Sequence, residues 1–136
     1  MTTTTAPSPT AEPTTATDQK VLVGLTHGPE EPENVLIAYL MGVEALRAGK
    51  EAAIWLTKDA VRVGLAGAVD DIVVDGAPSI SALHDEFVAA GGRFFACPVC
   101  VNLRGLAERD WSPGVAVAGA PAVYEFTDGG ALIFNY

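Results

Sequence analysis

The chain has 136 residues, a formal net charge of −9 at pH 7 and 49% hydrophobic residues. This length is enough for one compact domain with its own hydrophobic core. The acidic excess argues against binding to nucleic acid or to anionic membranes, because both interactions need a basic surface. The apolar runs fall short of the ~18 residues that a membrane span requires.

The N-terminal segment, residues 1–19, is rich in Thr, Ala and Pro and has no apolar periodicity. Such a segment buries too little apolar surface to offset the entropy lost on ordering, so we expect a disordered tail. It also lacks the basic region and the apolar core segment of a secretory signal. We therefore expect a cytoplasmic protein with one domain over residues 20–136.

The first part of this domain alternates between buried strands and an amphipathic helix. Val21–Thr26 and Ala52–Leu56 are nearly continuous apolar runs, which is typical of parallel strands buried on both faces. Between them, Pro32 fits the first turn of a helix and Gly49 fits its end. One face of this helix is expected to carry the apolar residues Leu36, Tyr39, Leu40, Val43 and Leu46.

The middle of the domain is less clearly patterned. Residues 60–65 predict a short helix, and Ile72–Val74 predicts a short third strand. A second amphipathic helix is predicted to begin at Pro78-Ser79 and to end at Gly91-Gly92. Its inward residues would be Ile80, Leu83 and Phe87. We expect His84, in the middle of this helix, to lie on the surface.

The last part of the domain predicts three more extended segments, Arg93–Ala96, Val115–Val117 and Ala131–Tyr136, with short helices over residues 101–106 and 121–126. The alternation of strands and helices argues for a three-layer α/β/α fold with a mainly parallel central sheet. We expect Val21–Thr26, Ala52–Leu56 and Arg93–Ala96 to be adjacent core strands.

The two cysteines, Cys97 and Cys100, are arranged as C-x-x-C directly after the predicted strand Arg93–Ala96. The start of the next helix presents unpaired N–H groups, which favour the nucleophilic thiolate over the thiol. We therefore predict that Cys97 lies at or just before the helix N-cap and is the primary nucleophile. Cys100, one turn further on, is a candidate resolving thiol. A disulfide across so short a loop would constrain the chain little, so we expect a reduced pair.

Other candidate residues also follow predicted strands. Ligands and catalytic groups of parallel sheets gather at the carboxyl ends of the strands. His27 is a candidate neighbour that assists the thiol, and Lys58 is a candidate cation for the thiolate. Arg104 is better explained as a cation at the end of a helix than as a catalyst.

Three stretches resemble the DsrE/DsrF-like family, which includes the TusD-type subunits of sulfur relays. They are residues 28–33 with the following helix, residues 48–57, and residues 91–97 followed by Leu103-Arg104-Gly105. The third stretch is the most specific of the three. Together with the terminal strand, the resemblance covers roughly Lys20 to Tyr136.

The resemblance implies a Rossmann-like or flavodoxin-like fold and homo- or hetero-oligomers, often trimers or hexamers. Sulfur-carrying members have a cysteine eight residues before the glycine of an Arg-Gly pair, and Cys97 matches that position relative to Gly105. Cys100 is an addition relative to TusD-type members. A neighbouring thiol of this kind can resolve a persulfide into a disulfide.

The leading functional expectation is a sulfur carrier, in which Cys97 accepts a persulfide sulfur and passes it to an acceptor thiol. Its partners would be sulfur donor and acceptor proteins or small thiols, with a homo-oligomer as the assembly. One alternative is a dithiol–disulfide oxidoreductase that uses Cys97 and Cys100, and another is a non-enzymatic oligomeric module that binds a small ligand. Structural zinc is a weaker alternative, because C-x-x-C supplies only two ligands. We expect no cofactor, since the sequence has neither a P-loop nor a G-x-G-x-x-G motif.

Overall fold

The computed structural model describes residues 19–136, so residues 1–18 of the expected tail lie outside the described part of the chain. Within residues 19–136, the strands are β1 (Lys20–Leu25), β2 (Glu51–Leu56), β3 (Arg93–Ala96), β4 (Val115–Val117) and β5 (Leu132–Asn135). The α-helices are α2 (Pro32–Arg47), α3 (Ile80–Ala89), α4 (Pro98–Leu103) and α5 (Ala120–Thr127). Two 3₁₀ helices, η1 (Lys58–Gly64) and η2 (Ala68–Asp71), follow β2.

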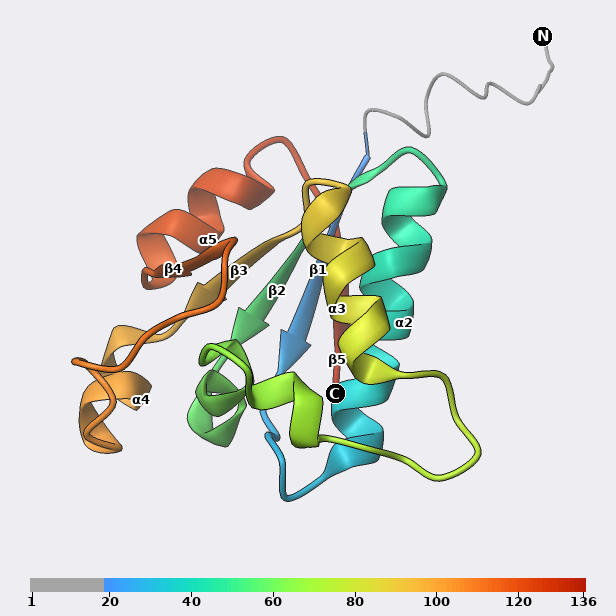
Figure 1. Ribbon diagram of the computed structural model, residues 1–136. Coiled ribbons are helices and arrows are strands. Elements are labelled where there is room, and N and C mark those ends of the chain that lie inside the picture. The colour runs from blue at the N-terminus through green and yellow to red at the C-terminus, as the bar shows by residue number, and fades with distance from the viewer. Residues whose placement is uncertain (1–18) are drawn as a thin grey trace, which may run out of the picture.

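All the strands pair in parallel, in the order β4-β3-β2-β1-β5 (Figure 1). Val23 of β1 lies opposite Ile54 of β2, and Ile54 lies opposite Phe94 of β3. The expected α/β/α fold and the adjacency of the three core strands are therefore confirmed. The chain reaches β5 by crossing from one edge of the sheet to the other through α5.

Helices cover the sheet on both sides (Figure 1). Because successive strand residues point to opposite faces, each strand contributes to two cores. The larger core lies under α2 and α3, and it includes Val23, Ile54 and Phe94. The smaller core lies under α5, where Phe126 packs with Leu22, Ala53 and Phe95.

The predicted strand Ile72–Val74 is wrong. The segment is a loop between η2 and α3, in which Ile72 is buried but Val73 is 67% exposed. Both sides of β2 are already paired, with β1 and with β3. A segment that follows β2 along the chain therefore finds no place beside it in the sheet.

The predicted surface position of His84 is also wrong, because this side chain is buried in the larger core. The Tyr39 hydroxyl and His84 Nδ1 share a hydrogen bond of 2.6 Å, and the His84 ring stacks on Phe94. His84 follows Ile80 by four residues, so it lies on the same apolar stripe of α3 as Phe87. Burial lowers the pKa of His84, although the charges of Asp85 and Asp70 partly oppose this shift.

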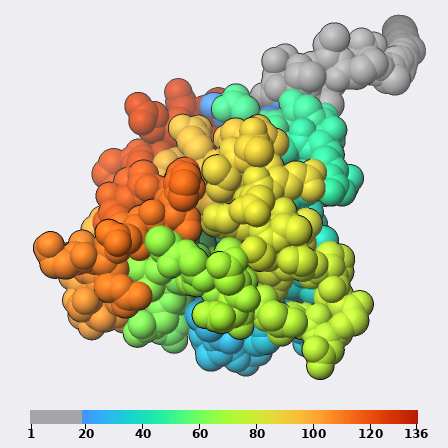
Figure 2. Space-filling view, viewed as in Figure 1, coloured from blue at the N-terminus to red at the C-terminus, as the bar shows by residue number. Residues whose placement is uncertain are grey.

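The carboxyl ends of the strands meet at one edge of the sheet, where α4 and η1 follow β3 and β2. Figure 2 shows α4 and its following loop on the surface, beside the segment that contains η1. None of the helices in residues 19–136 combines the length and the apolar character needed to cross a lipid bilayer.

Candidate functional site

Cys97 lies where β3 ends and α4 begins. Its backbone N–H donates to the Leu56 carbonyl over 3.0 Å, so the ladder between β2 and β3 continues up to this residue. Cys97 then leaves the strand as the N-cap of α4, and its Sγ accepts the backbone N–H of Cys100 over 3.4 Å. Pro98 occupies the first turn, where a missing N–H costs little. The predicted N-cap position of Cys97 is confirmed.

Cys100 lies one turn into α4 and is partly buried. Burial raises the pKa of the Cys100 thiol, and a hydrogen bond between its side chain and that of Cys97 raises it further. A backbone hydrogen bond from Lys58 and the charge of Arg104 act in the opposite direction. The raised pKa favours the protonated form of Cys100 at neutral pH.

The Arg104-Gly105 pair ends α4. Gly105 adopts a left-handed φ of 66°, and its N–H donates to the Asn102 carbonyl over 3.1 Å. The N–H of the buried Leu106 then donates to the Val101 carbonyl over 3.0 Å. These two bonds form a Schellman motif, which glycine favours because it lacks a Cβ. The glycine thus fixes the length of the helix that carries both cysteines.

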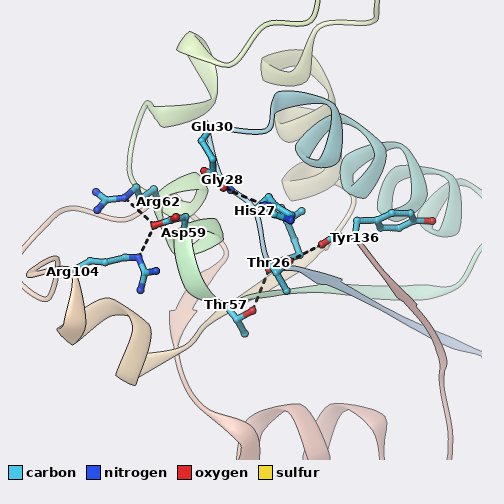
Figure 3. Close-up of polar contacts among 10 residues, drawn as sticks. Thr26, His27, Gly28, Glu30, Thr57, Asp59, Arg62, Arg104 and Tyr136 are labelled. Atoms are coloured by element: carbon cyan, nitrogen blue, oxygen red, sulfur yellow. Dashed lines mark hydrogen bonds and ion pairs between the residues drawn. The ribbon is translucent and has the colours of Figure 1, made fainter.

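An ion pair joins the end of α4 to η1. Arg104 Nε donates to Asp59 Oδ1 over 2.8 Å (Figure 3). An Arg104 terminal nitrogen donates to the Cys100 carbonyl over 3.3 Å. The hydrogen bond from Arg104 lowers the pKa of Asp59. Arg62 approaches the same carboxylate at 3.8 Å. Asp59 therefore holds Arg104 against the backbone of Cys100.

The loop after β1 lies against η1 on the same edge. His27 Nδ1 lies 3.3 Å from Glu30 Oε2, and the Gly28 N–H donates to Glu30 Oε1 over 3.0 Å (Figure 3). Gly28 packs so closely on η1 that an added Cβ would collide with the Asp59 carbonyl oxygen. The charge of His27 is among the influences that lower the pKa of Asp59.

Two threonines tie the strand ends together beside this loop. Thr57 Oγ1 donates to the Leu25 carbonyl over 3.5 Å, which links the ends of β2 and β1. Thr26 Oγ1 donates to the Tyr136 carbonyl over 3.2 Å, which links β1 to the residue after β5 (Figure 3). These hydrogen bonds join the strand ends from which the loops at this edge begin.

The sequence pattern of the DsrE/DsrF-like family matches residues 19–136 of this chain. The chain belongs to the DsrE/DsrF-like family. Among curated proteins, the uncharacterised protein MK0008 of Methanopyrus kandleri is 31% identical over 98 residues, which cover 72% of this chain and 78% of that protein. The uncharacterised protein MJ0760 of Methanocaldococcus jannaschii is 23% identical over 112 residues, or 82% of this chain. The match spans only 40% of the MJ0760 length.

Solved structures share the DsrE-like fold with this chain. The YchN protein of Escherichia coli superposes with a TM-score of 0.72 at 17% identity, covering 87% of this chain and 99% of YchN. The protein of unknown function MTH1491 of Methanobacterium thermoautotrophicum gives a TM-score of 0.62 at 17% identity, covering 88% of this chain and all of the other. At this level of identity, the likeness concerns the fold alone.

Within this family fold, the structure brings together Cys97, Cys100 and Arg104, whereas the contacts of His27 run to Glu30 and η1. The role of His27 beside the thiol stays a prediction. Lys58 acts on Cys100 through its backbone, while its side chain is exposed. Sequence reasoning missed the pairing of Asp59 with Arg104. These residues are 45 positions apart, and their only local signal is that Asp59 follows a predicted strand.

Proposed function

We propose that this chain is a sulfur carrier that accepts a persulfide sulfur on Cys97 and passes it to an acceptor thiol. The observation that carries the proposal is the place of Cys97. It is the N-cap of α4 at the carboxyl end of a central strand, with an amide N–H aimed at its sulfur. Membership of a family related to sulfur relay supports the same chemistry.

The chemistry needs a nucleophilic sulfur and a way to stabilise its anion. The Cys97 thiolate attacks the outer sulfur of a donor persulfide, so that Cys97 becomes the persulfide and the donor leaves as a thiol. A hydrogen bond to an ionised acceptor is stronger than one to a neutral acceptor. The Cys100 N–H is placed to donate to the Cys97 sulfur when that sulfur carries negative charge. An acceptor thiolate then attacks the outer sulfur on Cys97 and restores the starting thiol.

The surface around Cys97 fits a protein partner as well as a small thiol. Val99 and Leu103 of α4 are 64% and 77% exposed, and Val117 at the end of β4 is 45% exposed. We expect sulfur donor and acceptor proteins to contact these apolar side chains. Charge substitutions there should slow transfer from a protein donor without slowing transfer from a small persulfide.

The test loads sulfur onto the reduced Cys100→Ser variant with glutathione persulfide and then removes the donor. Intact-protein mass should increase by one sulfur atom. Added glutathione should then return the protein to its starting mass, and trapping with monobromobimane should detect new glutathione persulfide. Loading of Cys97→Ser run in parallel serves as the control and should fail. Absence of sulfur on Cys100→Ser, or sulfur that no thiol can remove, would contradict the carrier proposal.

A further inference from the structure

Cys100 is placed to react with whatever Cys97 carries. Its backbone N–H donates to Cys97 Sγ over 3.4 Å, so the first turn of α4 holds the two residues beside each other. If Cys97 alone carries the sulfur, the Cys100 thiol has no role in the reaction. A thiol fixed beside a persulfide reacts as an intramolecular nucleophile, and well-oriented intramolecular reactions reach effective molarities of about 10⁵ M or more. An external acceptor thiol must compete with that neighbour.

Groups outside α4 are placed to stabilise the thiolate form of Cys100. The Lys58 backbone hydrogen bond and the Arg104 charge both lower the pKa of Cys100, opposing the effects of burial and of Cys97. Lys58 has a left-handed φ of 54°, the one such non-glycine residue among those that the structure describes. Strained backbone of this kind persists only where its surroundings hold it. Arg104 is held in turn by Asp59.

We propose that Cys100 resolves the Cys97 persulfide and releases its sulfur as hydrosulfide, so that the protein has a persulfide-reducing activity. The inference rests on the proposed uptake of sulfur by Cys97. The Cys100 thiolate attacks the inner sulfur, Cys97 Sγ. A bond forms between Cys97 Sγ and Cys100 Sγ, and the bond from Cys97 Sγ to the outer sulfur breaks.

The step balances without an oxidant. The outer sulfur takes the electron pair of the broken bond and leaves as hydrosulfide, which takes up the proton that Cys100 gave up. The outer sulfur is reduced, and the two cysteine sulfurs are oxidised to a disulfide. A dithiol reductant must then open the disulfide before the next turnover. The persulfide thus has two fates, transfer to an acceptor thiol or release as hydrosulfide, and Cys100 limits its lifetime.

The experiment follows both products after reduced full-length protein is treated with glutathione persulfide and freed of the excess donor. Released hydrosulfide is trapped with monobromobimane, and the protein is weighed intact without reductant. The parent chain should release one hydrosulfide per protein and lose the mass of two hydrogens. Cys100→Ser should keep the added sulfur and release none. Cys97→Ser should neither release hydrosulfide nor change in mass.

Arg104→Gln and Arg109→Gln provide a matched pair of variants, since Arg109 is an exposed arginine of the loop after α4. Arg104→Gln should slow hydrosulfide release, and Arg109→Gln should not. In the Cys100→Ser background, both should leave the amount of bound sulfur unchanged. That amount separates an effect on the resolving step from an effect on folding or on uptake.

The outcomes distinguish this inference from the carrier proposal. If the parent chain keeps its persulfide as long as Cys100→Ser does and releases no hydrosulfide, the resolving role is wrong while the carrier stands. If Cys100→Ser binds no sulfur, the carrier proposal fails first. If Cys97→Ser still releases hydrosulfide, the inference is overturned, because Cys100 is then the primary acceptor.

Discussion

At the scale of single residues, the two cysteines differ in their surroundings. Cys97 caps a helix and accepts an amide hydrogen bond. Cys100 is partly buried against Cys97, and burial raises the pKa of its thiol above the ordinary value of 9.0. We base the proposed roles of nucleophile and resolving thiol on this difference in environment, because the C-x-x-C spacing alone does not distinguish the two residues.

We predict that iodoacetamide alkylates Cys97 faster than Cys100 at neutral pH. The alkylation rate of Cys100 should still be rising at pH 9, because its raised pKa keeps most of this thiol protonated there. Peptide-resolved mass spectrometry of the reduced chain over a pH series measures both rates. Equal rates for the two thiols at neutral pH would contradict the assignment.

We expect His84 to make the free energy of unfolding depend on pH. Since burial lowers the pKa of His84 below its ordinary value of 6.5, the unfolded chain binds a proton that the folded chain does not. The free energy of unfolding should therefore be fully retained above pH 6.5 and should fall as the pH drops below it. The slope for one proton is at most about 1.4 kcal/mol per pH unit.

Urea unfolding at a series of pH values tests this prediction. His84→Gln should flatten the slope between pH 6.5 and 5, although the variant loses some stability through poorer packing. Asp59 and Glu86 have lowered pKa values, so their protonation changes the free energy of unfolding only at lower pH. A parental slope that survives in His84→Gln would disprove the role of His84.

At the scale of secondary-structure elements, the site depends on how α4 is held. The helix has only six residues, Pro98–Leu103, which is too short to be stable alone. The N-cap at Cys97, the Schellman motif at Gly105 and the ion pair of Arg104 with Asp59 fix its two ends. The ion pair is the one of these contacts that ties α4 to η1.

We predict that Asp59→Asn makes the amide hydrogens of residues 98–104 exchange faster with deuterium, because Arg104 loses its ionic partner. Arg47→Gln is the control, since it breaks a comparable ion pair with Glu86 between α2 and α3. It should leave exchange in α4 unchanged. Unchanged exchange of α4 in Asp59→Asn would mean that the caps alone hold the helix.

The elements also show what the sequence could and could not predict. Continuous apolar runs identified β1, β2 and β3, and the turn from Ala96 into Pro98 placed Cys97 at an N-cap. Ile72–Val74 has a β-branched run, but strand pairing depends on partners that a local pattern does not reveal. His84 lies on the periodic apolar face of α3, and that position was a better guide than its polar side chain.

Contacts between distant segments explain the rest of the difference between prediction and structure. Asp59 and Arg104 meet because β2 and β3 are neighbours and both end at the same edge of the sheet. The left-handed backbone conformation of Lys58 could not be predicted from the residue type, since lysine does not favour that conformation. The ion pair and this backbone conformation both depend on the fold, so local sequence patterns do not predict them.

At the scale of the whole molecule, the sheet is covered unevenly. α5 covers the second face at Leu22, Ala53 and Phe95, whereas Ile133 lies opposite Leu22 on β5 and is 56% exposed. Leu132 on the same edge strand is 44% exposed. An edge strand with exposed apolar side chains is a ready site for association. We propose that a second copy of the chain covers this edge.

Ile133→Asp should therefore give a monomer, while the parent chain should be an oligomer at micromolar concentration. Added salt should strengthen the assembly, because copies that each carry a net charge of −9 repel one another. Val73→Asp is the matched control, since Val73 is an exposed apolar residue of the loop before α3. Light scattering distinguishes the states, and a parent chain that is only monomeric would contradict the prediction.

The central claim is that Cys97 is the residue that takes up sulfur. The most direct measurement is the initial rate of sulfur uptake from glutathione persulfide by the parent chain, Cys97→Ser and Cys100→Ser. Uptake is counted as bound sulfur, trapped by alkylation and located by peptide mass spectrometry, plus any hydrosulfide released. We predict uptake on Cys97 at a similar initial rate in the parent and in Cys100→Ser, and none above background in Cys97→Ser. Uptake by Cys97→Ser at the parental rate, with the sulfur found on Cys100, would contradict the account.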